Sequence, residues 1–101
     1  MKVVKVGLLG LGTVGGGTVN VLTKNAQDIS RRSGCEIVVS SASARDITRP
    51  RICNTDTLHL TTDSQEIIND PDVQIVVELM GGIEPAKSLI LEALSKGKHV
   101  V

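Results

Sequence analysis

Aromatic side chains are missing from this chain of 101 residues, which contains no Phe, Tyr or Trp. A core must therefore be built from aliphatic side chains, and the 41% hydrophobic content is sufficient for one modest domain spanning residues 1–101. Stacking of a base on an aromatic ring is also excluded. Any adenine bound by this chain would lie against aliphatic groups or against a guanidinium plane.

Net charge is lacking as well, because 11 basic residues balance 11 acidic ones. This balance argues against a nucleic-acid partner held by bulk charge. The two cysteines, Cys35 and Cys53, are too few for a disulfide framework or a metal cluster, so free thiols and no metal site are expected. No segment has the length of a membrane span, and Lys5 together with repeated glycines interrupts any signal peptide. These features predict a cytoplasmic protein without membrane partners.

Glycine, by contrast, is concentrated near the start of the chain. The apolar run 3–9 predicts a buried strand, Gly10-x-Gly12-x-x-Gly15 follows it, and a helical pattern comes next. This order is typical of a dinucleotide-binding turn, in which the first glycine allows a tight turn, the second admits the pyrophosphate and the third lets the helix approach the strand. A nucleotide-binding P-loop is excluded because Thr18 stands where that motif requires lysine.

The first helix is predicted to start at this turn and to extend over residues 13–32. Its N-terminal amides would bind an anion. The predicted cofactor-binding residues of this turn are Gly10, Leu11, Gly12, Thr13, Val14 and Gly15. The predicted apolar face of the helix comprises Val14, Val21, Leu22, Ala26 and Ile29.

The second strand is predicted over residues 35–44 and ends at Arg45 and Asp46. In a dinucleotide fold this strand end faces the adenosine ribose. An acid there accepts hydrogen bonds from the ribose of NAD, whereas an arginine can bind the 2′-phosphate of NADP. We predict that Arg45 binds the cofactor and favours NADP over NAD. Asp46 is as consistent with a turn residue as with a ribose ligand.

The remainder of the chain alternates between strands and helices. A loop is predicted at 47–54, strands at 58–60, 73–79 and from 99, a helix capped by Thr62 or Asp63 that runs to residue 69, and a helix from Pro85 to Gly97. Gln65 or Glu66 is expected to reach back to the cap. The roles of Arg49 and Arg51 stay open. Met80, Gly81 and Gly82 follow a buried strand and are predicted to line the nicotinamide side of the cofactor.

These elements predict an α/β fold: a Rossmann-like, doubly wound parallel sheet in a three-layer α/β/α arrangement. We expect the chain to be a fragment of a longer enzyme that stops shortly after its fifth strand begins. Neither His59 nor His99 lies beside a motif, so no catalytic residue is predicted.

Four segments together resemble the N-terminal part of homoserine dehydrogenase. They are the glycine turn 10–17, the strand end 44–46, the segment 78–86 (Glu-Leu-Met-Gly-Gly-Ile-Glu-Pro-Ala) and the segment 97–101. The resemblance covers the cofactor-binding portion of that family. It implies an NAD(P)-dependent oxidoreductase that interconverts aspartate semialdehyde and homoserine, on the route to threonine and methionine.

The resemblance also implies what lies beyond residue 101: a catalytic lysine in a Thr-Ala-Asn-Lys segment, a substrate and dimerisation region, and a sodium site. The parent enzyme is therefore expected to be a homo-oligomer acting on a small substrate, and the 101-residue chain to bind cofactor without turnover. Two alternatives stay open, namely a non-enzymatic NAD(P)-sensing module and the cofactor domain of another semialdehyde-type dehydrogenase.

Overall fold

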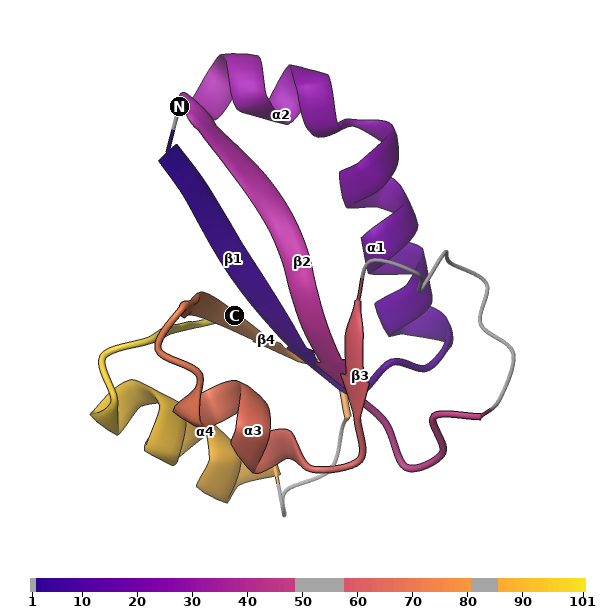
Figure 1. The fold of residues 1–101 in the computed structure, drawn as a ribbon, viewed down its shortest axis with the longest axis vertical. Helices are drawn as coiled ribbons and strands as arrows, with labels where there is room; N and C mark the ends of the chain where they lie inside the picture. The colour runs from indigo at the N-terminus through magenta and orange to yellow at the C-terminus, as the bar shows by residue number, and fades with distance from the viewer. Residues whose placement is uncertain (1, 49–57, 81–85) are drawn as a thin grey trace.

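The fold is a five-stranded, all-parallel sheet with helices on both faces (Figure 1). The computed structural model describes residues 2–48, 58–80 and 86–101, and it describes Thr13 and Val14 by their backbone alone. The strands are β1 (Lys2–Leu9), β2 (Cys35–Ser43), β3 (His59–Thr61), β4 (Val73–Glu78) and β5 (His99–Val100). The helices are α1 (Thr13–Lys24), α2 (Ala26–Ser33), α3 (Ser64–Asn69) and α4 (Ala86–Ser95). The predicted Rossmann-like α/β architecture is confirmed.

β1 lies at the centre of the sheet, whose strand order is β3-β2-β1-β4-β5. The chain leaves β1 towards β2 on one side, and β4 later pairs with β1 on the other side. The carboxyl ends of β1 and β4 therefore meet at the point where the strand order reverses. In open parallel sheets that point forms the ligand crevice.

Two hydrophobic clusters cover the opposite faces of the sheet. One joins Val6, Leu8 and Ala42 to Val19 of α1. The other joins strand residues such as Val76 to apolar residues of α3 and α4. The pair α1/α2 and the pair α3/α4 lie on opposite sides of the sheet in Figure 1. The aliphatic core predicted from composition thus exists as two layers of Val, Leu, Ile and Ala.

The first helical segment differs from its prediction, since the single helix expected over 13–32 is two helices. They meet at Asn25, whose backbone φ of −105° and ψ of 15° depart from helical values. The Asn25 side chain donates its Nδ2 to the Val21 carbonyl oxygen at 2.9 Å. The backbone N–H of Asn25 donates to the same oxygen at 3.1 Å, so the Val21 carbonyl accepts two bonds from Asn25 at the break.

The predicted buried face of that helix was also wrong in part. Val21 is 59% exposed and Ala26 is exposed as well, whereas Val19 is 6% exposed and belongs to the core. The reason is the tight packing of Gly15. A Cβ added to this residue would lie 2.5 Å from the Gly10 carbonyl oxygen. Because Gly15 must face the strand, positions four and seven residues further on share its face, and those are Val19 and Leu22.

The α3 cap is confirmed at Asp63, whose Oδ1 accepts from the Gln65 backbone N–H at 3.0 Å. The expected return contact is wrong for both candidates. Gln65 donates its side-chain Nε2 to Glu92 of α4 at 2.8 Å, and Glu66 pairs with His59 at 3.2 Å. The α3 side chains therefore connect this short helix to neighbouring elements.

Lys98 lies at the turn before β5 and is only 9% exposed. Its Nζ donates to the carbonyl oxygens of Asp70 and Val73, each at 2.6 Å. This lysine joins the start of β5 to the turn that precedes β4. No helix among the described residues is long and apolar enough to cross a membrane.

Candidate functional site

The candidate site is at the carboxyl edge of the sheet, where backbone hydrogen bonds hold three strand ends together. The Ser43 carbonyl oxygen at the end of β2 accepts from Gly10 N at 3.0 Å and from Leu11 N at 2.8 Å. Leu79 N, after β4, donates to the Leu9 carbonyl oxygen at 2.9 Å. The glycine turn is therefore bonded to β2 on one side, and the strand that precedes it is bonded to the end of β4 on the other.

Gly10 makes the sharp turn off β1 with a φ of +104°, a value that side chains other than glycine rarely adopt. A Cβ at this position would lie 3.0 Å from Met80 Cγ and 3.2 Å from Met80 N. Two predicted cofactor-binding positions, Gly10 and Met80, are thus brought into contact. The predicted positions Gly81 and Gly82 lie outside the described residues.

Gly12 and Gly15 have opposite surroundings. Around the position of a Gly12 Cβ there is no atom within 4 Å among the described residues. A Cβ added at Gly15 would lie 2.5 Å from the Gly10 carbonyl oxygen. Gly15 therefore serves packing, whereas Gly12 leaves open space at the surface, as a pyrophosphate would require.

Helix α1 begins immediately beside this open space. Gly12 is its N-cap and has no side chain with which to cap the helix, and its first turn carries no acidic residue. Gly16 N already bonds to the Gly12 carbonyl oxygen at 2.9 Å, so the helical ladder starts there. The N–H groups of Thr13, Val14 and Gly15 belong to the first turn, where helix geometry leaves donors without helical partners and the dipole favours an anion.

Leu11 contributes to the turn through its backbone and its packing. Its side chain is 2% exposed and belongs to the cluster on the α1 side of the sheet. Its N–H is engaged by the Ser43 carbonyl oxygen. Leu11 would therefore shape the predicted cofactor site by fixing the turn.

Arg45 and Asp46 lie just beyond the end of β2, and both are exposed. Since Ser43 is bonded to the glycine turn, Arg45 follows that contact by two residues. The Asp46 Oδ1 accepts from Thr48 N at 2.9 Å and from Thr48 Oγ1 at 2.5 Å. Of the two interpretations of Asp46, these contacts favour the turn residue. Arg49, Arg51 and Cys53 lie outside the described residues.

Sequence reasoning missed Ser43 and Thr48. Ser43 acts through its carbonyl oxygen, which no side-chain pattern reveals, and its Oγ accepts from Ser64 Oγ of α3 at 2.8 Å. Thr48 could have been found, because Asp-x-Thr is a pattern in which the acid bonds to the backbone two residues later. Ser43 connects the glycine turn to β2 and α3, whereas Thr48 holds Asp46 within its own loop.

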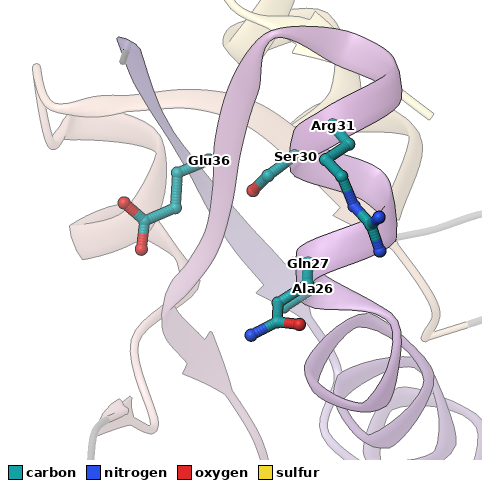
Figure 2. Close-up of a pocket in the computed structure, with 5 residues that line it drawn as sticks. All are labelled: Ala26, Gln27, Ser30, Arg31 and Glu36. Atoms are coloured by element: carbon teal, nitrogen blue, oxygen red, sulfur yellow. The ribbon is translucent and has the colours of Figure 1, made fainter.

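A second hollow, of about 520 Å³, lies between α2 and β2 and is distinct from this site. Its lining residues are Ala26, Gln27, Ser30, Arg31 and Glu36 (Figure 2). The Arg31 and Glu36 side chains point away from each other in Figure 2, so the two charged groups of this lining do not converge. Glu36 is at the amino end of β2, about 23 Å of strand from Ser43. Among the described residues no cluster of three or more His, Cys, Asp or Glu could hold a metal ion.

Comparison with known proteins agrees with this geometry. Residues 10–101 match the family model described as "Homoserine dehydrogenase, NAD binding domain". A homoserine dehydrogenase from Synechocystis sp. is 52% identical over 100 residues, which is 97% of this chain and 22% of the relative. The homoserine dehydrogenase of Pseudomonas aeruginosa is 49% identical over 102 residues, covering 100% of this chain and 23% of the relative.

Solved structures show the same similarity. A crystal structure of the S. aureus homoserine dehydrogenase matches with a TM-score of 0.92 and 43% identity, over 99% of this chain and 25% of that chain. The chain thus spans about a quarter of the length of the relatives that it matches.

Proposed function

Because the chain belongs to the family of homoserine dehydrogenase NAD-binding domains, we propose that it is the cofactor-binding part of an oxidoreductase that interconverts L-homoserine and L-aspartate 4-semialdehyde. The bound nicotinamide would supply the hydride chemistry. The residues of this chain would bind and orient the cofactor. The substrate-binding region and the oligomer interface of the enzyme would reside in sequence that corresponds to the other three quarters of the relatives. A cytoplasmic location is part of this proposal.

The open space at Gly12 carries the proposal. A pyrophosphate placed there would contact the first-turn amides of α1, and the absence of a Cβ lets it approach the backbone. Gly10 and Gly15 hold the turn in place, Leu11 fixes it to β2, and Met80 borders it from the end of β4. We propose Gly81 and Gly82 as further cofactor-binding positions on the basis of the sequence pattern.

We further propose that the cofactor is NADP in preference to NAD, with Arg45 as the residue that selects it. Arg45 is exposed next to the end of β2, which is the strand end that faces the adenosine ribose in dinucleotide folds. Its guanidinium can bind a 2′-phosphate through two parallel hydrogen bonds. The contacts of Asp46 with Thr48 support the arginine rather than the acid as the ligand.

The experiment is a calorimetric titration of Gly12→Val with NADP. The added carbons enter open space, so the protein is expected to stay folded while cofactor affinity is lost. Gly17→Val is the matched control, because its Cβ also meets no atom of the described residues within 4 Å and it lies beyond the first turn of α1. A folded Gly12→Val protein that binds NADP as tightly as the wild type would falsify the site.

A further inference from the structure

The loop after β2 holds the Asp46 carboxylate through two donors from a single residue. Thr48 donates its backbone N–H and its hydroxyl to the same oxygen, Asp46 Oδ1, at 2.9 and 2.5 Å. Both residues are exposed. A hydroxyl bonded to a carboxylate is among the short, charge-assisted hydrogen bonds. This oxygen of the acid is therefore held against its own loop by two bonds, and loss of either one weakens the restraint.

The position of this loop gives the contact a consequence for the cofactor. Asp46 follows Arg45, and both follow the strand end that is bonded to the glycine turn. An acid at this place accepts the ribose hydroxyls of NAD and repels the 2′-phosphate of NADP. An arginine has the opposite preference. Which cofactor binds depends on which of these neighbouring side chains is available to the ribose.

We propose that Thr48 is a specificity-determining residue for the dinucleotide. By binding Asp46 it restrains the acid from the ribose site and leaves the 2′-position to Arg45. Thr48 acts through Asp46, so it is a positioning residue and does not itself contact the cofactor. This inference rests on the proposed function, in which Arg45 binds the 2′-phosphate.

The test is a set of titrations with NADP and NAD on the purified protein. Thr48→Val keeps the shape and the backbone N–H but removes the hydroxyl. Loss of one such hydrogen bond is expected to lower the NADP-to-NAD affinity ratio by about fivefold, through tighter NAD binding and weaker NADP binding. Thr48→Ser keeps a hydroxyl at this position and should keep the wild-type NADP-to-NAD affinity ratio. Thr23→Val, an exposed threonine on α1, is the matched control and should leave the ratio unchanged.

Asp46→Asn identifies the acid as the group that is released. In the wild-type background it should leave NAD affinity unchanged, because the carboxylate is already engaged by Thr48. In the Thr48→Val background it should abolish the gain in NAD affinity, and this non-additivity reports the coupling directly. Circular dichroism of each variant checks that the fold is retained.

The outcomes separate this proposal from the one on which it rests. An unchanged ratio in folded Thr48→Val overturns the role of Thr48, and so does a large loss of NAD affinity in Asp46→Asn alone. If Arg45→Ala leaves NADP affinity unchanged, the role of Arg45 is wrong, yet the NAD titrations still decide whether Thr48 restrains Asp46. If the wild type binds neither dinucleotide, both proposals are overturned.

Discussion

The glycine turn has a packed side and an open side, and a glycine lies on each. On the packed side, Gly15 faces the Gly10 carbonyl oxygen. At the opposite, amino edge of the sheet, Lys98 is packed in the same sense, because it is buried with two carbonyl partners. On the open side, no atom of the described residues lies within 4 Å of a Gly12 Cβ, and Arg45 is exposed. We infer that the packed glycine and lysine maintain the fold, whereas the open glycine and arginine serve the ligand.

The largest expected effect is that of Gly15→Ala, which should lower the free energy of unfolding by about 2–3 kcal/mol, because the new Cβ meets backbone that cannot move aside. Gly17→Ala, in the same helix but in open space, should instead raise stability by up to about 1 kcal/mol. Urea unfolding followed by circular dichroism measures both. Equal stability of the two variants would contradict the division into packed and open sides.

Lys98→Met should be the next most damaging change. It removes a buried ammonium that donates to two carbonyl oxygens, and hydrogen bonds to charged groups contribute about 1.5–3 kcal/mol. Lys96→Met, at an exposed lysine in the same turn, is the control and should leave stability nearly unchanged. Thermal unfolding of both variants is the measurement. A Lys98→Met protein as stable as Lys96→Met would mean that the buried contacts contribute nothing net.

Arg45→Ala should leave stability unchanged and act on binding alone. The loss of a charge-assisted bond to phosphate corresponds to roughly 10- to 100-fold weaker NADP binding, with NAD affected far less. Arg31→Ala, at an exposed arginine beside the second hollow, should change neither affinity. Titration of both variants and the wild type with NADP and with NAD measures these affinities. An equal loss for NADP and NAD would show that Arg45 does not select between them.

Local patterns in the sequence predicted most of the fold, because a strand followed by spaced glycines is a short-range signal. Contacts between distant residues were not predictable in the same way. Lys98 looks like any surface lysine until the chain brings it to Asp70 and Val73, which are 28 and 25 positions away. The same holds for the candidate site. The glycine turn could be predicted from the spacing of its glycines, whereas the contact of the Ser43 carbonyl oxygen with that turn could not.

The division of α1 from α2 illustrates the same limit at short range. The apolar spacing predicted one continuous helix, but the Asn25 side chain bonds to the Val21 carbonyl oxygen at the break. The buried face was misjudged for a different reason. Only the close approach of Gly15 to Gly10 determines that Val19, and not Val21, faces the sheet.

The smallest expected effect concerns Glu66, which belongs to neither side of the turn. Hydrogen bonds from the Thr61 hydroxyl and from His59, together with the charge of His59, lower the pKa of Glu66 from its ordinary value of 4.5. The folded state therefore binds the proton less readily than the unfolded state. The contribution of Glu66 to stability is fully present above about pH 4.5 and disappears as the pH falls through the lowered pKa.

Glu66→Gln should accordingly reduce stability slightly at neutral pH and not at all in strong acid, because wild-type Glu66 is then protonated in both states. The effect should be small, since both partners are largely exposed to solvent. The measurement is the urea midpoint of both proteins at several pH values between 7 and 2, with Glu36→Gln, at an exposed glutamate of β2, as the control. A difference between wild type and Glu66→Gln that persists unchanged in strong acid would show that the carboxylate charge is not its source. Cofactor affinity at neutral pH should be the same in both proteins, because His59 and Thr61, the partners of Glu66, belong to β3 and lie outside the proposed cofactor site.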